Sequence, residues 1–492
     1  MGLPRRPRIT EVLMLAPSSS RIVSSWFQQP LHLNLPAPVV PLAAAEATPA
    51  KVAVDSPREF GFGVLSAICK PELVDQVIAE CGRLERRCRL LPARLMVYSL
   101  LFMCLCANLS YDKLMHHLAG TAGAPGSWSP PHKSAFLRAR RRLGSEVMEQ
   151  LFRALARPLA DSRRDRGCFW RDRRVVAIDG TTVELSAVPE VEQAFGGPTA
   201  NDGMRAGLPQ ARVVTLIECG TRALLDAELG HYLVGENTLA ARLVRSISAG
   251  MILLADRGFP SKELWSLFTD AGADLVCRAK DPIATRVLKH LSDGSYLARF
   301  GKGQPLTLRV IEYTLEGSDQ IYRLLTNLLD PDAAPAPELA ALYAERWEVE
   351  ILINEIKVRQ CSSRPLRSQT EAGLRQEFWA HCALHQISRQ LVYQAATTIP
   401  DRDPDRISFS LAQDAIRRSV SWATGLRVRK LAAVVQHAIR ELTMLRALIT
   451  RRHRAYPRVV RRKWNRYAAR TKDSSRADTH RPRRPRIIVC GA

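Results

Sequence analysis

The sequence predicts an α/β core built on a mixed sheet, with an all-helical region before it and further helices after it. From about residue 168, segments with a hairpin pattern come first and helix–strand alternation follows. This order gives a mixed sheet covered by helices. Residues 57–120 have instead the periodicity of helices. A run of strand-like segments over residues 281–334 predicts a β-rich insertion in the core.

A chain of 492 residues exceeds one compact core, so several domains are expected. The first part is rich in Pro, Ala and Ser and lacks the apolar segment and cleavage site of a signal peptide. It predicts a disordered leader, or a start codon placed too far upstream. The predicted segments are the leader at 1–56, a helical domain at 57–165, an α/β domain at 166–395 with the insertion at about 281–334, a helical region at 396–467 and a disordered basic tail at 468–492.

The net charge of the chain is strongly positive. Lys and Arg number 72 against 48 Asp and Glu, a formal charge of +24. This excess favours a polyanionic partner, with nucleic acid as the first candidate, although a basic proteome would give the same bias. The 11 Cys are scattered without a Cys-x-x-Cys pair, which argues against zinc and disulfides and for a reducing cytoplasm. The longest apolar stretch, of ~13 residues, is too short to span a membrane.

The region before the core is expected to be helical. Residues 71–80 have helical periodicity. A second helix is expected to begin near residue 91, with Pro92 in its first turn, and Ser110 is expected to cap a third helix at its N-terminus. Residues 121–131 are dense in Gly and Pro and predict a loop. Residues 134–143 predict a short basic helix. It is either a recognition helix for a DNA groove or a solvated basic face.

The core elements follow from apolar runs and the residues that end them. A strand over residues 174–179 continues through Gly180 into a further extended stretch. Asn237 is expected to cap a helix that runs to residue 249. The continuous apolar run at 251–255 is typical of a buried strand. The other predicted elements are hairpin strands at 211–219 and 223–229, a helix at 261–271, a strand at 273–277, insertion strands at 296–300, 306–313 and 320–328, and helices at 371–396 and 410–423.

One helix face is predicted to carry four polar residues: Tyr343, Arg346, Glu350 and Lys357. At ~100° per residue they fall within an arc of roughly 60°. Apolar residues take another side, so the helix can pack while it presents this polar stripe. A carboxylate flanked by two cations and a phenol suits a metal-bound phosphate. The alternative is a solvated face with an Arg346–Glu350 ion pair, which explains only two of the four residues.

Two aspartates upstream each end an apolar strand. Asp179 ends the first strand of the core, and Asp256 follows the run at 251–255 directly before an Arg-Gly-Phe turn. Ligand sites gather where the strands of such sheets end, although each Asp alone also suits a turn or a helix cap. Together with Glu350, the two aspartates fit a pair of divalent ions, which take oxygen ligands.

Other charged residues lie near these motifs in the sequence. Arg278 and Lys280 follow the strand at 273–277, close to the expected active edge, and are expected to contact DNA; the alternative is surface charge. His231 and Glu236 invite assignment as additional ligands, but a lone His in this setting is expected to make a structural hydrogen bond.

These motifs resemble those of bacterial insertion-sequence transposases of the DDE type. The branch is the one marked by Tyr-(2)-Arg-(3)-Glu-(6)-Lys, often called insertion-sequence family four. The matching pieces are residues 175–181, residues 253–259 and the signature from Tyr343 to Lys357. The family's N-terminal domain also resembles residues 57–155, and the similarity extends beyond the signature, so it covers most of the chain.

The resemblance implies that residues 57–165 form a helical DNA-binding domain. It also implies that residues 166–395 form a ribonuclease-H-like catalytic domain with a β-rich insertion. It further implies that Asp179, Asp256 and Glu350 are catalytic and hold two Mg²⁺ ions, with Mn²⁺ expected as a substitute. Tyr343, Arg346 and Lys357 are implied to contact DNA phosphates near the scissile bond. The implied reaction is cleavage at terminal inverted repeats and strand transfer into target DNA, by a homodimer on paired ends. A cytoplasmic, nucleoid-associated protein without a membrane partner is expected.

The resemblance has one departure and leaves two alternatives. Relatives that open the second strand through a DNA hairpin hold a flipped base with a Trp in the insertion, and residues 281–334 contain no Trp. The insertion's Tyr and Phe residues are expected in its core, although one of them could stack a base. The alternatives are a ribonuclease-H-like nuclease that cleaves without joining, and a transposase-derived DNA-binding protein without activity.

Overall fold

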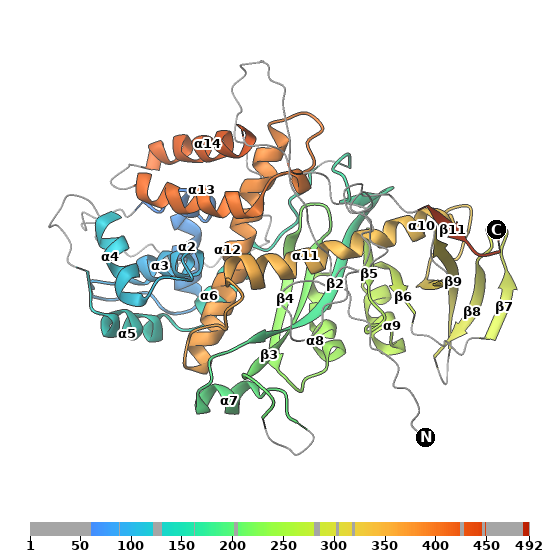
Figure 1. Ribbon diagram of the computed structural model, residues 1–492, viewed down its shortest axis with the longest axis horizontal. Coiled ribbons are helices and arrows are strands. Elements are labelled where there is room, and N and C mark those ends of the chain that lie inside the picture. Colours follow the sequence, from blue (N-terminus) through green and yellow to red (C-terminus); the bar gives the residue numbers. More distant parts are fainter. Residues whose placement is uncertain are drawn as a thin grey trace, which may run out of the picture. The chain divides into compact units, whose positions relative to one another are not determined.

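The central sheet of the described chain begins with three antiparallel strands. Strand β2 (Arg173–Glu184) pairs with β3 (Gln210–Glu218), which pairs with β4 (Ala223–His231). On its other side β2 runs parallel to β5 (Met251–Ala255), and β5 runs parallel to β6 (Asp274–Arg278). The order β4-β3-β2-β5-β6, with helices between the parallel strands, is a ribonuclease-H-like α/β core (Figure 1). It confirms the mixed sheet that the sequence predicts.

The structure is a computed structural model, and its described residues form one compact unit. That unit spans Arg58–His453 and Pro485–Ala492. The predicted leader, Lys280 and most of the predicted basic tail lie outside the described residues. The described residues are 61–87, 89–121, 130–161, 163–200, 205–279, 286–301, 305–316, 320–423, 428–444, 448 and 486–491.

The two faces of the sheet are buried in different apolar clusters. Along β2, Val175 and Ala177 belong to one cluster, whereas Val176 and Ile178 belong to the other. This alternation is the period of two that a strand buried on both faces must have. Helices α11 (Trp347–Asn354) and α12 (Glu371–Thr397) cover the first face. The second face is covered by α8 (Glu236–Arg242), η1 (Leu243–Ser246) and α9 (Lys262–Asp270).

Helix α8 begins and ends earlier than the sequence predicts. Glu236 is its first residue, and the residue before it is Gly235, whose backbone is extended. Asn237 is therefore inside the first turn and does not cap the helix. The regular helix ends at Arg242 and tightens into a 3-10 turn, so the predicted extension to residue 249 is wrong. The change brings a carboxylate, rather than an amide, to the start of the helix.

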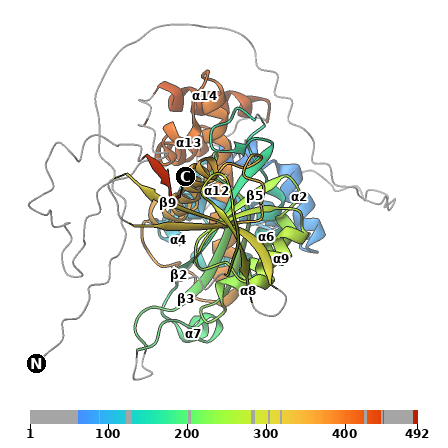
Figure 2. The same ribbon diagram turned by 90° about the vertical axis from the view of Figure 1, so that its right-hand side faces the viewer.

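The β-rich insertion continues the core sheet. Strand β10 (Tyr322–Thr326) pairs antiparallel with β6, and the sheet then runs through β9 (Leu306–Leu315) and β8 (Tyr296–Phe300) to β7 (Arg286–His290). Figure 2 views these strands from their outer side. Three of them match the predicted strands, and β7 was not predicted. A short strand β1 (Phe169–Trp170) pairs with β2 at the start of the core.

The end of the chain differs from the expected disordered tail. Residues Ile487–Val489 form β11, which pairs antiparallel with β9 at residues 313–315. Three consecutive β-branched side chains favour a strand. The pairing of β9 with β8 ends at Val310. Beyond it, the backbone N–H and C=O groups on that side of β9 are open to pairing with another strand. Local strand propensity and an open edge together order these residues.

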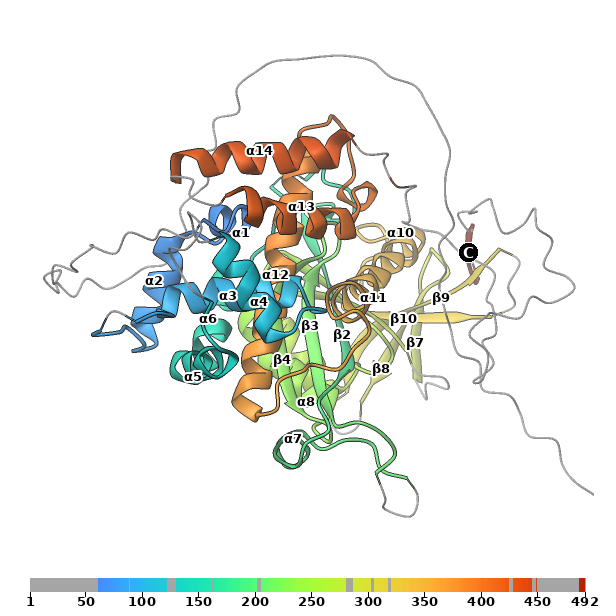
Figure 3. The same cartoon turned by 60° about the vertical axis from the view of Figure 1, so that its left-hand side comes forward.

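One long helix joins the N-terminal helices to the core. Helix α12 contacts α3 and α6 as well as strand β4 (Figure 3), and most of its residues are buried. Among the described residues, no helix is long and apolar enough to cross a membrane. The remaining elements are α1 (Val64–Ile68), α2 (Pro71–Glu80), α3 (Ala93–Leu105), α4 (Tyr111–Thr121), α5 (Lys133–Leu143), α6 (Glu146–Leu155), α7 (Pro189–Phe195), α10 (Ala336–Leu342), η4 (Pro404–Arg406), α13 (Phe409–Trp422) and α14 (Val428–Met444).

The basic helix α5 buries one of its arginine side chains inside the protein. Arg140 is 5% exposed, and its guanidinium donates to Gln376 Oε1 (2.8 Å) and Ser368 Oγ (3.0 Å) at the base of α12. Arg142 donates to the Leu91 carbonyl (3.2 Å). A DNA-contact role for this helix therefore falls to its exposed arginines, such as Arg141.

Replacing Arg140 should destabilise the protein, whereas replacing Arg141 should not. Arg140→Ala leaves the buried acceptors of α12 without donors, which should cost about 2–4 kcal/mol of unfolding free energy. Arg141→Ala, on the exposed side of the same helix, should change stability by less than ~0.5 kcal/mol. Urea unfolding monitored by tryptophan fluorescence measures both. Equal midpoints for the two variants would contradict the structural role of Arg140.

Candidate active site

The parallel pairing of β2 with β5 brings the two aspartates to the same edge of the sheet. Ile178 lies opposite Ala255 in the register, so Asp179 and Asp256 are the next residue along each strand. The apolar runs before them are buried, which fixes both strands in place. Asp179 Oδ1 accepts a hydrogen bond from the Gly180 backbone N–H (2.8 Å). One edge of the core thus carries two carboxylates on neighbouring strands.

The signature segment is not the uninterrupted α-helix that the spacing predicts. After α10 the chain makes a 3-10 turn, η2 (Tyr343–Arg346), then the regular helix α11 (Trp347–Asn354), then a π-helical segment, η3 (Glu355–Gln360). Such wide turns are rare and are often found at functional sites. The tight and wide turns alter the angles between the four polar residues, but all four still lie on the side of the helix that meets β2 and β5.

Arg346 links the helix to the strand edge. Its Nη2 donates to Glu350 Oε1 (2.7 Å), and its Nη1 lies 3.7 Å from Asp179 Oδ2. The guanidinium is 4% exposed. Tyr343, one turn earlier, is 7% exposed and donates its hydroxyl to the Ala255 carbonyl (3.3 Å). Glu350 is thereby connected to Asp179 through one side chain, and the predicted i,i+4 pair is only part of a larger contact.

Lys357 reaches the same strand from the π-helical segment. Its Nζ donates to the Thr182 carbonyl (2.9 Å) and to Thr181 Oγ1 (3.3 Å), both just beyond Asp179 on β2. Burial lowers the pKa of Lys357, and Glu184 partly opposes this effect. The lysine thus brings a positive charge to the strand that bears Asp179.

The carboxylates of the site repel one another in a partly buried setting. Burial first, then Glu350 and Asp256, raise the pKa of Asp179 to about 7, although Arg346 and the Gly180 N–H act in the opposite direction. Burial alone would lower the pKa of Arg346, but Tyr343, Glu350 and Asp256 raise it above its usual value. Arg346 is therefore charged, and the negative charge around it is incompletely neutralised.

The donor set fits a divalent cation. Asp256 Oδ1 is a buried oxygen without a hydrogen-bond partner among the described residues, and carboxylate oxygens are the ligands that Mg²⁺ prefers. In their described positions, however, no three acidic, His or Cys side chains of the described chain are arranged to hold a metal ion. Arg346 explains the difference, because it lies between Asp179 and Glu350. The Glu350 side chain is 39% exposed, which leaves it room to turn.

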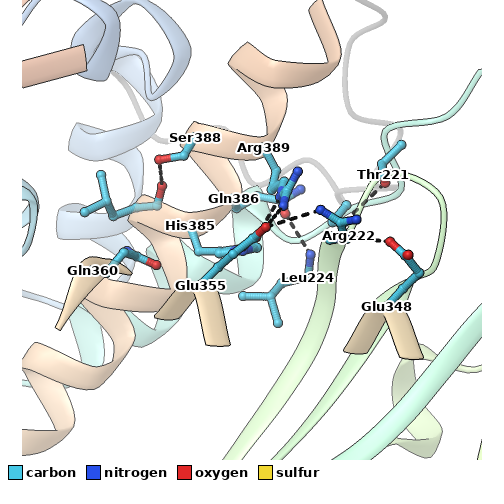
Figure 4. Close-up of polar contacts among 12 residues, drawn as sticks. Thr221, Arg222, Leu224, Glu348, Glu355, Gln360, His385, Gln386, Ser388 and Arg389 are labelled. Atoms are coloured by element: carbon cyan, nitrogen blue, oxygen red, sulfur yellow. Dashed lines mark hydrogen bonds and ion pairs between the residues drawn. The ribbon is translucent and has the colours of Figure 1, made fainter. Parts of the chain in front are cut away.

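Two glutamates on the signature segment anchor it from behind. Glu348 accepts from Arg222 Nε (2.6 Å), and Glu355 accepts from Arg222 Nη1 (3.3 Å) and Arg389 Nε (3.0 Å), all in buried positions (Figure 4). His385 of α12 also hydrogen-bonds Glu355 (3.1 Å). Burial alone would raise the pKa of Glu355, but Arg389, His385 and Arg222 lower it to about 2.

This buried network was not predicted from the sequence. Arg222 lies in the turn between β3 and β4 with a positive φ of 58°, far along the chain from its partners. Arg222 also pairs with Asp405 of η4, so it connects three separate parts of the fold. The glutamates have the spacing of a solvated helix face, and nothing local distinguishes them. The network fixes both ends of the segment that carries Glu350.

The remaining predicted residues are partly accounted for. Cys277 lies opposite Ala255 in the register, so Arg278 is at the same sheet edge as Asp256, where its guanidinium lies 4.9 Å from the centre of the Tyr322 ring. Lys280 lies outside the described residues. His231 accepts from the Leu233 N–H (3.1 Å), the structural role expected of it. In the insertion, Tyr313 and Tyr322 stack on each other with ring centres 5.3 Å apart.

The fold and the acidic strand edge define a class of DNA-processing enzyme, the DDE transposases. A family model described as "Transposase DDE domain" matches residues 170–387, and one described as "Insertion element 4 transposase N-terminal" matches residues 59–153. The two models follow each other along the chain and cover both its N-terminal helices and its core. The chain belongs to the insertion-sequence-four family of DDE transposases.

Individual transposase sequences are similar to this chain as well. Transposase InsG for insertion sequence element IS4 of Escherichia coli K12 is 28% identical over 410 residues, which cover 80% of this chain and 91% of InsG. Putative transposase InsZ of the same organism is 28% identical over 148 residues, 29% of this chain and 47% of InsZ. Among solved structures, a piggyBac transposase synaptic complex with hairpin DNA has 8% identity and a TM-score of 0.43, over 76% of this chain and 84% of that one.

The contribution of Asp179 to the stability of the metal-free protein should fall as the pH rises from about 4 to about 7. The folded state holds the Asp179 proton up to a pKa of about 7, against a usual 3.8, so ionising this carboxyl costs stability above that range. Asp179→Asn removes the cost. In EDTA, the variant should melt at a higher temperature than wild type at pH 8 and at nearly the same temperature at pH 4.5, measured by differential scanning fluorimetry.

The matched control for this titration is Asp270→Asn, at an exposed position at the end of α9. Its melting temperature should follow that of wild type at both pH values. An Asp179→Asn variant less stable than wild type at pH 8 would show that the ionised carboxylate is stabilising, contrary to the burial described above.

Removing Arg222 should be far more costly than removing an exposed arginine. Arg222→Met leaves the buried Glu348, Glu355 and Asp405 without this shared counter-charge, and breaking such an arrangement costs about 3–5 kcal/mol. Arg242→Met, whose side chain is 55% exposed beside Glu228, should cost less than ~1 kcal/mol. Urea midpoints measure both. A small loss for Arg222→Met would mean that the network does not hold the signature segment.

Proposed function

We propose that this protein binds the terminal inverted repeats of an insertion sequence, cleaves the DNA there and joins the ends to target DNA. The observation that carries the proposal is the contact chain from Asp179 through Arg346 to Glu350, at the strand edge shared with Asp256. Carboxylates and a guanidinium gathered at one strand edge suit the cleavage of a phosphodiester. We further propose that the protein acts as a homodimer on paired ends, in the cytoplasm and on the nucleoid.

The catalytic residues in this proposal are Asp179, Asp256 and Glu350. They would hold two Mg²⁺ ions, with Mn²⁺ able to substitute. Such ions lower the pKa of an attacking water or hydroxyl and stabilise the leaving oxygen. The buried, partnerless Oδ1 of Asp256 and the raised pKa of Asp179 support the assignment, because both reflect negative charge that the protein alone does not neutralise.

The cations of the signature are proposed to receive the DNA backbone. Arg346 keeps two buried donors, Nε and Nη1, without hydrogen-bond partners among the described residues. Paired guanidinium donors suit phosphate oxygens. Lys357 adds a second positive charge further along β2. For Tyr343, whose hydroxyl is engaged by the Ala255 carbonyl, the predicted DNA contact depends on a rearrangement of that bond.

Further DNA contacts are proposed along the same edge. Arg278 lies beside Asp256 in the register and carries its charge over the Tyr322 ring. Lys280 follows it in the sequence and is proposed to act with it. These contacts would be electrostatic and independent of the base sequence, so they should weaken with salt.

A plasmid assay distinguishes the proposed reaction from its alternatives. Purified protein and Mg²⁺ are incubated with a plasmid that carries the element's ends and with a target plasmid. Nicks confined to the ends, followed by covalent joining to the target, support transposition. Promiscuous nicking without joining supports a nuclease, and retarded DNA without any cut, at every metal concentration tried, supports an inactive binding protein.

Replacing any of the three carboxylates should abolish cleavage and preserve DNA binding. Asp179→Asn, Asp256→Asn and Glu350→Gln are expected to lower the cleavage rate by at least ~10³-fold, because each removes a ligand for the ions that stabilise the transition state. Gel shifts with end-containing DNA should retain affinity within severalfold. Asp270→Asn, at the exposed end of α9, serves as the control. Full activity in any of the three variants would remove that residue from the catalytic set.

A further inference from the structure

Strand β11 places a buried side chain against Tyr313 of β9. The Cys490 N–H donates to the Glu312 carbonyl (2.9 Å), so these two residues occupy a hydrogen-bonded position of the antiparallel ladder. Bonded and non-bonded positions alternate along such a ladder, and side chains come closest at the non-bonded ones. Val489 and Tyr313 form the next pair along, so their side chains are in close apposition. Both belong to the same apolar cluster, and Val489 is 9% exposed.

Tyr313 begins a series of contacts that ends at the active edge, the strand ends that carry Asp179 and Asp256. On its other side Tyr313 is opposite Tyr322 of β10, and the two rings stack with their centres 5.3 Å apart. The Arg278 guanidinium lies 4.9 Å from the centre of the Tyr322 ring. The β5–β6 register puts Arg278 at the same sheet edge as Asp256. Each step from β11 to Arg278 is therefore a direct contact.

The charges around Tyr313 agree with this position. Burial and the neighbouring Tyr322 raise the pKa of Tyr313, whereas Arg278 and Arg346 act in the opposite direction. Two cations of the active edge are therefore close enough to act on the Tyr313 hydroxyl. A displacement of this ring would change the surroundings of both.

Strand β11 also contacts α10, the helix that leads into the signature segment (Figure 1). Helix α10 ends at Leu342, directly before Tyr343. Protection of an open strand edge explains the backbone pairing of β11, because any strand edge left open is prone to wrong pairing. It does not explain why β11 lies between α10 and the one tyrosine of β9 that stacks toward Arg278.

We propose that β11 is a positioning element for DNA binding at the active edge. Val489 fixes the Tyr313–Tyr322 stack, and the stack holds the Arg278 guanidinium in place for a DNA phosphate. This inference rests on the proposed function, in which Arg278 contacts DNA. A long side chain that is ordered before binding loses less conformational entropy when it binds. Val489 is thus a positioning residue, and Arg278 is the residue that touches DNA.

The test is the affinity of the full-length protein for a DNA duplex that carries an element end, measured by fluorescence anisotropy at a fixed salt concentration. Cys490→Pro removes the backbone donor to Glu312. It should raise the Kd by about 3–10-fold, the effect expected when one long side chain must be ordered on binding. Cys490→Ser is the matched control, because it keeps the backbone N–H, and its Kd should equal that of wild type.

A double variant separates positioning from general stabilisation. In an Arg278→Ala background, Cys490→Pro should change the Kd by less than ~2-fold, because the residue through which β11 acts is absent. An equal rise of the Kd in both backgrounds would overturn the inference. So would an unchanged Kd for Cys490→Pro while Arg278→Ala binds weakly. Neither result would affect the proposed cleavage by the three carboxylates.

Hydrogen exchange without DNA tests the structural part of the inference by itself. Mass spectrometry should show faster amide exchange over residues 311–315 and 322–326 in Cys490→Pro than in Cys490→Ser, because the stacked tyrosines lie in these two segments. Unchanged exchange would overturn the inference whatever the DNA affinities are.

Two outcomes remain. An Arg278→Ala variant with the Kd of wild type would remove the proposed DNA contact of Arg278, and the inference with it. End cleavage, measured in parallel with Mg²⁺, would then show whether the rest of the proposed function stands. Should Cys490→Pro fail to fold, as judged by its melting temperature, Val489→Ala removes the contact with Tyr313 and keeps the backbone. The inference expects the same rise of the Kd for this variant, and an unchanged Kd would overturn it.

Discussion

The buried guanidinium of Arg346 is the interaction on which the active edge depends. It holds Glu350 on one side and lies beside Asp179 on the other, in a place where its charge cannot be screened by solvent. Without it, three carboxylates would repel one another at the end of the sheet. With it, the helix and the strand are held together at the one point where acids from distant parts of the chain must meet.

The rest of the fold keeps this contact in register. The parallel β2–β5 pairing sets the two aspartates side by side, and the network around Arg222 and Glu355 fixes the helix from behind. Because Glu355 is also bound by Arg389 of α12, the helix that closes the N-terminal domain supports the active edge. The N-terminal helices and the core thus share a buried structural element, and neither is expected to move without affecting the other.

The sequence predicts those features that depend on local chemistry. Apolar runs predicted the core strands. The spacing of the signature residues predicted a polar helix face, and in the structure these residues meet β2 and β5. Features decided by distant contacts were missed. The signature segment departs from a regular α-helix where Tyr343 and Lys357 bond to β5 and β2, and the ordering of Ile487–Val489 depends on an open strand edge.

The central claim is that the acids at this edge converge on a divalent cation. Anomalous diffraction from crystals soaked in Mn²⁺ tests it most directly, because the signal locates the ion without reference to activity. The account predicts an anomalous peak bonded to Asp179 and Asp256, with Glu350 turned away from Arg346 and toward the ion. A fully occupied Mn²⁺ site elsewhere, with Glu350 still held by Arg346 and no peak at the strand edge, would contradict it.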